Sequence, residues 1–454
     1  MRSSHLVHTV LALVLSLAGL AACGPAESQT SRTDVAPGAG ALAASSLRSP
    51  SSPERSARPA RARSSPSRRE APEQIRGIYV NAAVAGSPKR LERLLALADS
   101  TEINAFVVDV KTADGVRFRS GVALADRLAN PRAPRIARLD ALADTLHAHH
   151  LYAIARVVTF KDPRLSKARP AWSILKPGGG LWVDKVGNTW VSPWDPNVWE
   201  YDIAIAEAAA RAGFDEIQFD YVRFPEAYES LPPQVHPEAQ GDRTDAIAAF
   251  LAEAGERLHP LGVAVSADVF GMSMDEADDV GIGQQWERLS VVADRLLPMV
   301  YPSHFLPTHL PGVPRPNRMP YQTVRTAVGM GVIRNHRLSA AGGHPARITP
   351  WLQAFDAPWV DPDFRYGPDQ ARAQMEAVYD DGLDGWILWN PSSSYDAVAP
   401  ALAPTTESHA RPYTPPAPLV RRIDRYEGWG MHRARARALG GPPSPRQLPP
   451  APEA

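Results

Sequence analysis

Eight short runs rich in valine, isoleucine and phenylalanine recur through the middle of this chain, and longer segments of helical periodicity separate most of them. The runs cover 77–81, 105–111, 152–160, 216–225, 263–271, 295–302, 348–355 and 385–391, and the helical periodicity is clearest over 88–99, 139–149, 197–212, 244–258 and 368–381. This alternation is typical of parallel sheets built from β–α units, and eight units predict an α/β protein with a (β/α)8 TIM barrel. The alternative is a doubly wound open sheet, which ordinarily carries a glycine-rich phosphate turn that no strand here has in the required place.

The start of the chain has the pattern of a secretion signal. Arg2 precedes an apolar run over 6–22 that is too short and too early for a typical spanning helix. The run ends in Leu20-Ala21-Ala22-Cys23-Gly24, which matches the lipobox of bacterial lipoproteins. We therefore predict a lipoprotein signal peptide over 1–22 and lipidation of Cys23, with an ordinary signal peptide and an incidental cysteine as the alternative. The protein would then be anchored in the membrane of the cell envelope, on its periplasmic or its outer-membrane and extracellular face.

Composition sets the domain boundaries and excludes several classes of function. The residues around the runs are rich in proline, alanine, serine and arginine, which predicts a disordered tether over 23–72, a barrel domain over 73–403 and a proline-rich tail over 404–454. Within the tail, 426–431 is a candidate for a short helix docked on the barrel. Because Cys23 is the only cysteine, disulfides, thiolate metal cages and cysteine nucleophiles are excluded. The formal net charge of zero gives no indication of a nucleic-acid partner.

Polar side chains follow the carboxyl ends of several predicted strands, where a barrel of this kind builds its active site. By the period of two along a strand, Asp109 and Lys111 would share the pore-facing side of the second run, and Gln218 and Asp220 that of the fourth. In the fifth run, Ser266 and Asp268 would likewise share one side of the strand. Two carboxylates on adjacent strands are what glycoside hydrolysis requires, which favours Asp220 and Asp268 as the catalytic pair. The alternative is that one of them forms an ion pair with Lys111, Arg156 or Arg223 and so holds the barrel layers in register.

Several longer blocks of sequence carry a resemblance to a known family. The blocks are GIYV (77–80), FVVDVK (106–111), FDEIQFDYVRFP (214–225), SADVFG (266–271), MVYPSH (299–304) and GWILWNP (385–391). Their order and content resemble a bacterial domain family of unknown function that is named for glycosyl hydrolases, over about residues 75–395. The resemblance implies a barrel distantly similar to the alpha-amylase superfamily, with Asp220 as the nucleophile and Asp268 as the acid/base. Two departures stand out: Gln218 occupies the place of the arginine that such enzymes carry two residues before the nucleophile, and Asp268 that of a glutamate.

Three functions are consistent with these features. The first is a glycosidase that acts on a cell-envelope or extracellular polysaccharide without a cofactor or metal. Its substrate would be bound by residues at strand ends and in loops, namely Asp109, Lys111, Arg156, Gln218, Arg223, Tyr301, His304, Trp386 and Asn390, with stacking from further aromatic rings among Trp182, Trp190, Trp194, Trp351 and Trp389. The second is a non-catalytic barrel that binds a glycan or a protein at the envelope. The third is a metal-dependent hydrolase, which is disfavoured because only one histidine, His304, lies at a strand end.

Overall fold

Eight parallel strands form a closed barrel in the computed structural model, which describes residues 71–403, 411, 413–426 and 428. The predicted TIM barrel is confirmed, and each predicted run contains or overlaps one of its strands. In the order of the chain these are β1 (Arg76–Val80), β2 (Ala105–Thr112), β4 (Tyr152–Val158), β5 (Glu216–Asp220), β6 (Ala264–Phe270), β7 (Arg295–Met299), β9 (Trp351–Gln353) and β10 (Trp386–Trp389). The predicted signal peptide, Cys23 and the tether up to residue 70 lie outside the described residues.

The barrel closes because β1 pairs in parallel with both β2 and β10. The hydroxyl of Tyr395 secures this seam by donating a hydrogen bond to the carbonyl of Tyr79, 2.8 Å away and 316 residues earlier in the chain. Two short strands add to the sheet: β3 (Gly115–Val116) forms a hairpin with β2, and β8 (Arg347–Ile348) pairs with β7 ahead of β9.

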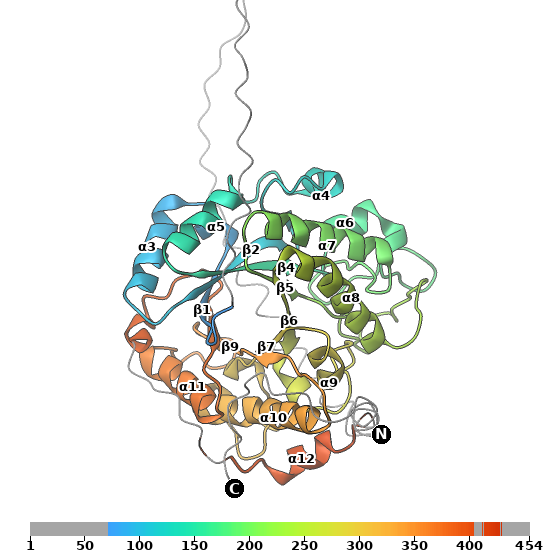
Figure 1. Cartoon of the computed structure of the whole chain (residues 1–454). Coiled ribbons are helices and arrows are strands. Elements are labelled where there is room, and N and C mark those ends of the chain that lie inside the picture. The colour runs from blue at the N-terminus through green and yellow to red at the C-terminus, as the bar shows by residue number, and fades with distance from the viewer. Residues whose placement is uncertain (1–70, 404–410, 412, 427, 429–454) are drawn as a thin grey trace, which may run out of the picture.

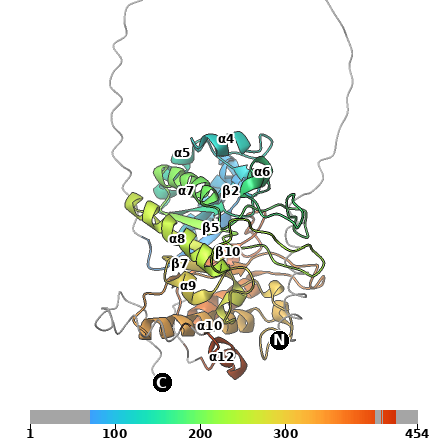
Figure 2. The same cartoon turned by 90° about the vertical axis from the view of Figure 1, so that its right-hand side faces the viewer.

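Helices surround the strands, as Figures 1 and 2 show. The longer ones are α3 (Pro88–Asp99), α5 (Leu139–Ala148), α7 (Pro196–Arg211), α8 (Arg243–Leu258), α10 (Pro320–Ala340) and α11 (Pro368–Asp380). The shorter ones are α2 (Ala82–Ala85), α4 (Ala123–Leu128), α6 (Pro163–Ala168), α9 (Trp286–Ser290) and α12 (Ala417–Ile423). None of the helices in the described ranges has both the length and the apolarity needed to cross a membrane.

The core has two parts because side chains alternate along each strand. On β2, Phe106, Val108 and Val110 belong to the large cluster between the barrel and its helices. Val107 belongs instead to a smaller cluster inside the barrel, together with Ile154 and other residues. The apolar side chains of this smaller cluster fill the interior of the barrel, and the polar residues lie nearer the carboxyl ends of the strands.

Part of the predicted tail packs against the barrel. Leu419 and Ile423 of α12 are fully buried, and α12 lies beside α10 in both views (Figures 1 and 2). The guanidinium of Arg422 lies 2.9 Å from Glu276, which follows β6 in the chain. The candidate helix at 426–431 lies mostly outside the described residues, and the docked helix comes before it.

Candidate active site

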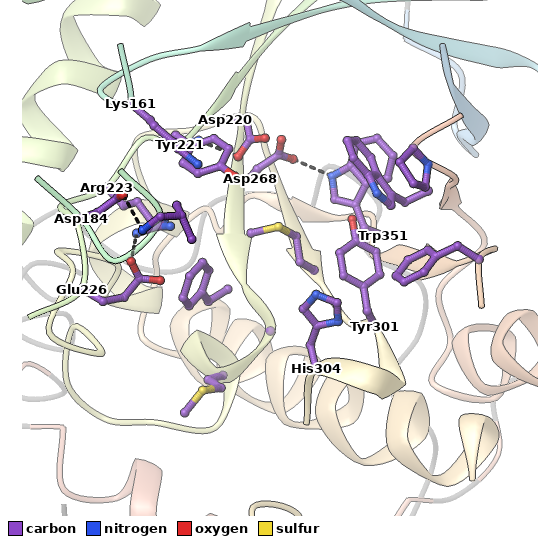
Figure 3. Close-up of a pocket in the computed structure, with 18 of the residues that line it drawn as sticks. Lys161, Asp184, Asp220, Tyr221, Arg223, Glu226, Asp268, Tyr301, His304 and Trp351 are labelled. Carbon is purple, nitrogen blue, oxygen red and sulfur yellow. Dashed lines mark hydrogen bonds and ion pairs between the residues drawn. The ribbon is translucent and has the colours of Figure 1, made fainter. Parts of the chain in front are cut away.

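A cavity of about 400 Å³ opens at the carboxyl ends of the strands, where the fold places active sites (Figure 3). Six of the predicted site residues line it: Arg156, Asp220, Arg223, Asp268, Tyr301 and His304. Five others do not, namely Asp109, Lys111, Gln218, Trp386 and Asn390. We call this cavity the cleft.

Asp220, the last residue of β5, is held by three hydrogen-bond donors. The Nε of Arg156 donates to its Oδ2 at 2.9 Å, and Nη2 of the same guanidinium donates to Oδ2 as well. The backbone N–H of Tyr221 donates to Oδ1 at 2.5 Å. The Arg156 guanidinium and the backbone N–H of Tyr221 thus direct three N–H donors and one positive charge at the carboxylate of Asp220.

Asp268, on the adjacent strand β6, is held in a different way. The side-chain amide of Gln218 and the indole N–H of Trp351 both donate to its Oδ1, at 2.5 and 2.6 Å. Burial and the charge of nearby Asp220 raise the pKa of Asp268 well above its ordinary value. Because both donors occupy Oδ1, the proton of the neutral acid belongs on Oδ2.

The two carboxylates lie close together beside the Nε of one guanidinium. The Nε of Arg156 is 2.9 Å from Oδ2 of Asp220 and 3.9 Å from Oδ2 of Asp268, so these oxygens are less than about 7 Å apart. This bound on one pair of oxygens is compatible with the spacing of about 5 Å between the carboxyl groups of retaining glycosidases.

Arg156 is in turn oriented by a buried acid behind it. Its Nη1 donates to Oδ1 of Asp109 at 2.5 Å, and the hydroxyl of Tyr79 donates to the other oxygen of Asp109 at 2.5 Å. Asp109, Arg156 and Gln218 stand side by side in the register of β2, β4 and β5. Asp109 therefore fixes the arginine that holds Asp220, at a level below the cleft.

Sequence comparison assigns the chain to a family. The family described as "putative glycosyl hydrolase domain" matches residues 77–395, which cover nearly the whole barrel. The chain belongs to this glycosyl hydrolase domain family. The resemblance carried by the six sequence blocks is thereby confirmed. No curated protein matches this glycosyl hydrolase domain.

Two solved structures illustrate what the glycosyl hydrolase domain is similar to. A hypothetical protein from Ruminiclostridium thermocellum ATCC 27405 is 37% identical, over 42% of this chain and 97% of that chain, with a TM-score of 0.38. The PgaB (BpsB) glycoside hydrolase domain from Bordetella bronchiseptica is 16% identical, over 73% of this chain and 100% of that chain, with a TM-score of 0.51. The second likeness shows a shared fold.

The departure at Gln218 has a structural counterpart in this glycosyl hydrolase domain. An arginine does contact Asp220, but it is Arg156 from the neighbouring strand, which pairs with Gln218 in the register of β4 and β5. Gln218 instead donates to Asp268. Asp220 therefore receives hydrogen bonds from the guanidinium of Arg156, whereas Asp268 receives one from the neutral amide of Gln218 and lies 3.9 Å from the guanidinium.

The prediction that Lys111 faces the pore is wrong. The pairing of β2 with β4 shifts register between Asp109 and Lys111, so the lysine turns away from Asp109 and the cleft. Its Nζ is fully buried, 2.9 Å from Asp162 and 3.1 Å from Asp202 of α7. Burial raises the pKa of Asp202 to about 7, although the lysine opposes this shift. Lys111 thus joins the barrel to a helix by a buried ion cluster.

Neither Trp386 nor Asn390 lines the cleft. Trp386 begins β10, at the opposite end of the strand, and its indole N–H donates to the hydroxyl of Tyr379 on α11 at 2.9 Å. Asn390 donates to the carbonyl of Ala354 at 2.7 Å and so connects two loops. The tryptophan of this strand that lines the cleft is Trp389, which stacks on Tyr79 with ring centroids 4.0 Å apart.

Tyr301 and His304 line the side of the cleft nearest Trp351 (Figure 3). Burial raises the pKa of Tyr301 well above its ordinary value, and burial lowers the pKa of His304 to about 4. Both are neutral at physiological pH, so they can exchange hydrogen bonds with a substrate without adding charge. Nowhere in the described part of the chain do three or more histidine, cysteine, aspartate or glutamate residues form a group able to hold a metal ion.

Sequence reasoning missed several residues of the cleft. They are Lys161, Asp184, Lys185, Tyr221, Glu226, Asp356 and Trp359, among others. All lie in loops after the strands, where no periodicity marks which side chains turn inward. The block 214–225 contained one signal in the sequence, because Tyr221 directly follows Asp220. In the structure, Tyr221 has a backbone φ of +51°, which is unusual for a residue with a side chain.

Proposed function

We propose that this barrel is a retaining glycosidase acting on a cell-envelope or extracellular polysaccharide, with Asp220 as nucleophile and Asp268 as acid/base. The observation that carries this is the asymmetry of the pair. Asp220 receives hydrogen bonds from a guanidinium and a backbone N–H. Asp268 is buried and has a raised pKa, and no donor of the described residues forms a hydrogen bond with its Oδ2, which lies 3.9 Å from the Nε of Arg156. Two carboxyl groups whose surroundings separate their protonation states are suited to act as base and acid at the same pH.

The reaction follows from these states. As the bond from the anomeric carbon to the leaving oxygen breaks, Asp268 donates its proton to that oxygen and a carboxylate oxygen of Asp220 bonds to the anomeric carbon. A water molecule then attacks the same carbon, the ionised Asp268 accepts its proton, and Asp220 leaves as the carboxylate. The charge of Arg156 remains beside Asp220 throughout, and this stabilises the leaving carboxylate in the second step.

The test compares hydrolysis of a panel of bacterial polysaccharides by the purified full chain with that by Asp220→Asn. Release of reducing ends should fall at least about a thousandfold in the variant, because the amide cannot form the glycosyl ester. Asp99→Asn removes a carboxylate that pairs with His149 on the surface and should leave the rate unchanged. NMR of the first product formed should show retained anomeric configuration. Binding of polysaccharide without turnover, unaffected by Asp220→Asn, would instead indicate a non-catalytic glycan-binding barrel.

We also propose that the protein is anchored to the membrane of the cell envelope through lipidated Cys23. Support comes from the apolar run over 6–22 and the lipobox that ends it. A barrel held in this way would act on polymers within reach of the membrane surface.

A further inference from the structure

One wall of the cleft carries two cations on a single aromatic ring. The Nζ of Lys161 lies 4.6 Å from the ring centroid of Tyr221, and the guanidinium carbon of Arg223 lies 5.2 Å from it. Figure 3 shows the three side chains on the same side of the catalytic carboxylates. We call Lys161, Tyr221 and Arg223 the cationic wall.

The cationic wall is built from the same backbone that holds the nucleophile. Tyr221 adopts the left-handed conformation, with φ of +51°, and its N–H binds Asp220. Its carbonyl accepts a hydrogen bond from the N–H of Phe160, the residue before Lys161, at 3.3 Å. Strained backbone of this kind persists where the surrounding structure enforces it, commonly at ligand sites. The two cations are therefore positioned next to the point where a sugar would bond to Asp220.

Positive charge exceeds negative charge within this group. Arg223 donates to Glu226 at 3.1 Å and to the carbonyl of Phe224 at 2.9 Å. Lys161 is half-buried, and among the described residues no carboxylate oxygen lies within 4.0 Å of its Nζ. A partly desolvated ammonium without an anion is unfavourable, and an anionic ligand would compensate it.

Asp184, which also lines the cleft, is engaged in its own loop. Its Oδ1 accepts hydrogen bonds from the backbone N–H groups of Val186 and Asn188, at 3.0 and 2.8 Å. Its Oδ2 accepts one from the indole N–H of Trp190 at 2.9 Å. These three donors hold the carboxylate of Asp184 as part of a turn. Asp184 therefore does not serve as the anion for Lys161.

The opposite wall is mostly aromatic, and its carboxylate Asp356 is paired with Arg365, whose Nε lies 3.5 Å away. Phe355 and Trp359 stack with their rings 16° from parallel, Trp389 lies near Tyr79, and the lowered pKa of His304 keeps the imidazole uncharged. A sugar bound between these walls meets apolar rings on one side and two cations on the other. The hydroxyl oxygens of an uncharged sugar can accept hydrogen bonds from the ammonium, but only an anionic group also compensates its charge.

We propose that the cleft takes an acidic glycan, in which a sugar carboxylate next to the scissile bond binds Lys161 and Arg223. This proposal rests on the proposed glycosidase function, of which it names the substrate class. An ammonium and a guanidinium form charge-assisted hydrogen bonds with a carboxylate, and a partly enclosed pair of this kind is weakened by salt but not abolished.

The test uses uronic-acid polysaccharides, each paired with its carboxyl-reduced form, which keeps the linkages and removes the charge. Binding and cleavage by the full chain are measured for both forms at low and high salt. The acidic form should bind about tenfold more tightly or have a correspondingly lower KM, and Lys161→Met should remove this preference. Lys167→Met removes the same charge from an exposed site outside the cleft and should keep the preference.

Each outcome separates the two proposals. Equal treatment of acidic and reduced forms, or an unchanged preference in Lys161→Met, would overturn the acidic-glycan proposal while cleavage still supported a glycosidase. Preferential binding of acidic forms with no cleavage would support the ligand class and refute the glycosidase. Binding and cleavage of neither form in any pair would overturn the acidic-glycan proposal, while hydrolysis of the bacterial polysaccharide panel would still decide the glycosidase.

Discussion

The substitution Gln218→Met tests the role of Asp268 through a single hydrogen bond. Gln218 is fully buried and does not line the cleft, and its amide donates to Oδ1 of Asp268 at 2.5 Å. The other side-chain atom, Oε1, has no partner among the described residues, so methionine of similar volume removes one donor and one unsatisfied acceptor together. The fold should therefore tolerate the change.

The magnitude follows from the charge on the acceptor. A hydrogen bond to a charged group stabilises it by about 1.5 to 3 kcal/mol, and this one favours the carboxylate over the carboxylic acid. Its loss should strengthen proton binding by Asp268 about ten- to a hundredfold. Because the general acid must be protonated, activity falls as pH rises through the pKa of Asp268. Gln218→Met raises that pKa further, so the alkaline limb of the pH profile should move to higher pH.

The assay is the pH dependence of kcat/KM on the best substrate from the polysaccharide panel. Gln370→Met is the control, since Gln370 caps α11 far from the acid, and it should leave the alkaline limb in place. An alkaline limb in Gln218→Met that stays fixed or moves to lower pH would refute the assignment of Asp268 as the acid held by this amide.

Two further predictions concern positions outside the cleft. Lys111→Met leaves two buried carboxylates without their cation and should lower the free energy of unfolding by about 3 to 5 kcal/mol. Urea unfolding should show a smaller loss at mildly acidic than at alkaline pH, and part of the loss should be recovered by adding Asp202→Asn; a loss below about 1 kcal/mol would show that the ion cluster is not the reason for the buried lysine. Cys23→Ser should release the protein from the membrane fraction into the soluble fraction of cells that make it, and unchanged partition would exclude the lipid anchor.

The barrel could be predicted from the sequence because every strand is buried on both sides. A run such as 105–111 is therefore almost continuously apolar and stands out against its surroundings. The 21-residue helix α10 did not stand out, because its buried residues include nine in succession over 323–331 and therefore lack a helical period. The docked segment explains this pattern, since Tyr413 and α12 cover a face that would otherwise be exposed.

The site was only partly predictable, for a different physical reason. Asp220 ends β5 and Asp268 lies two residues before the end of β6, so the fold alone brings them to one rim. The turn of Lys111 away from Asp109 depends on a register shift that leaves no mark in residue types. The contacts of Arg156 with Asp109 and Asp220 depend on the stagger between strands, which is set by packing around the whole barrel.

The seam between β1 and β10 makes the first and last strands of the barrel dependent on each other. Until β10 is in place, β1 has one edge without a hydrogen-bonding partner, and the barrel is an open sheet with two such edges. A chain cut before β10 is therefore not a smaller barrel but a sheet prone to pair with other copies. Closing a loop of this length is slow compared with pairing neighbouring strands, so completion of the seam is expected to be the late step of folding.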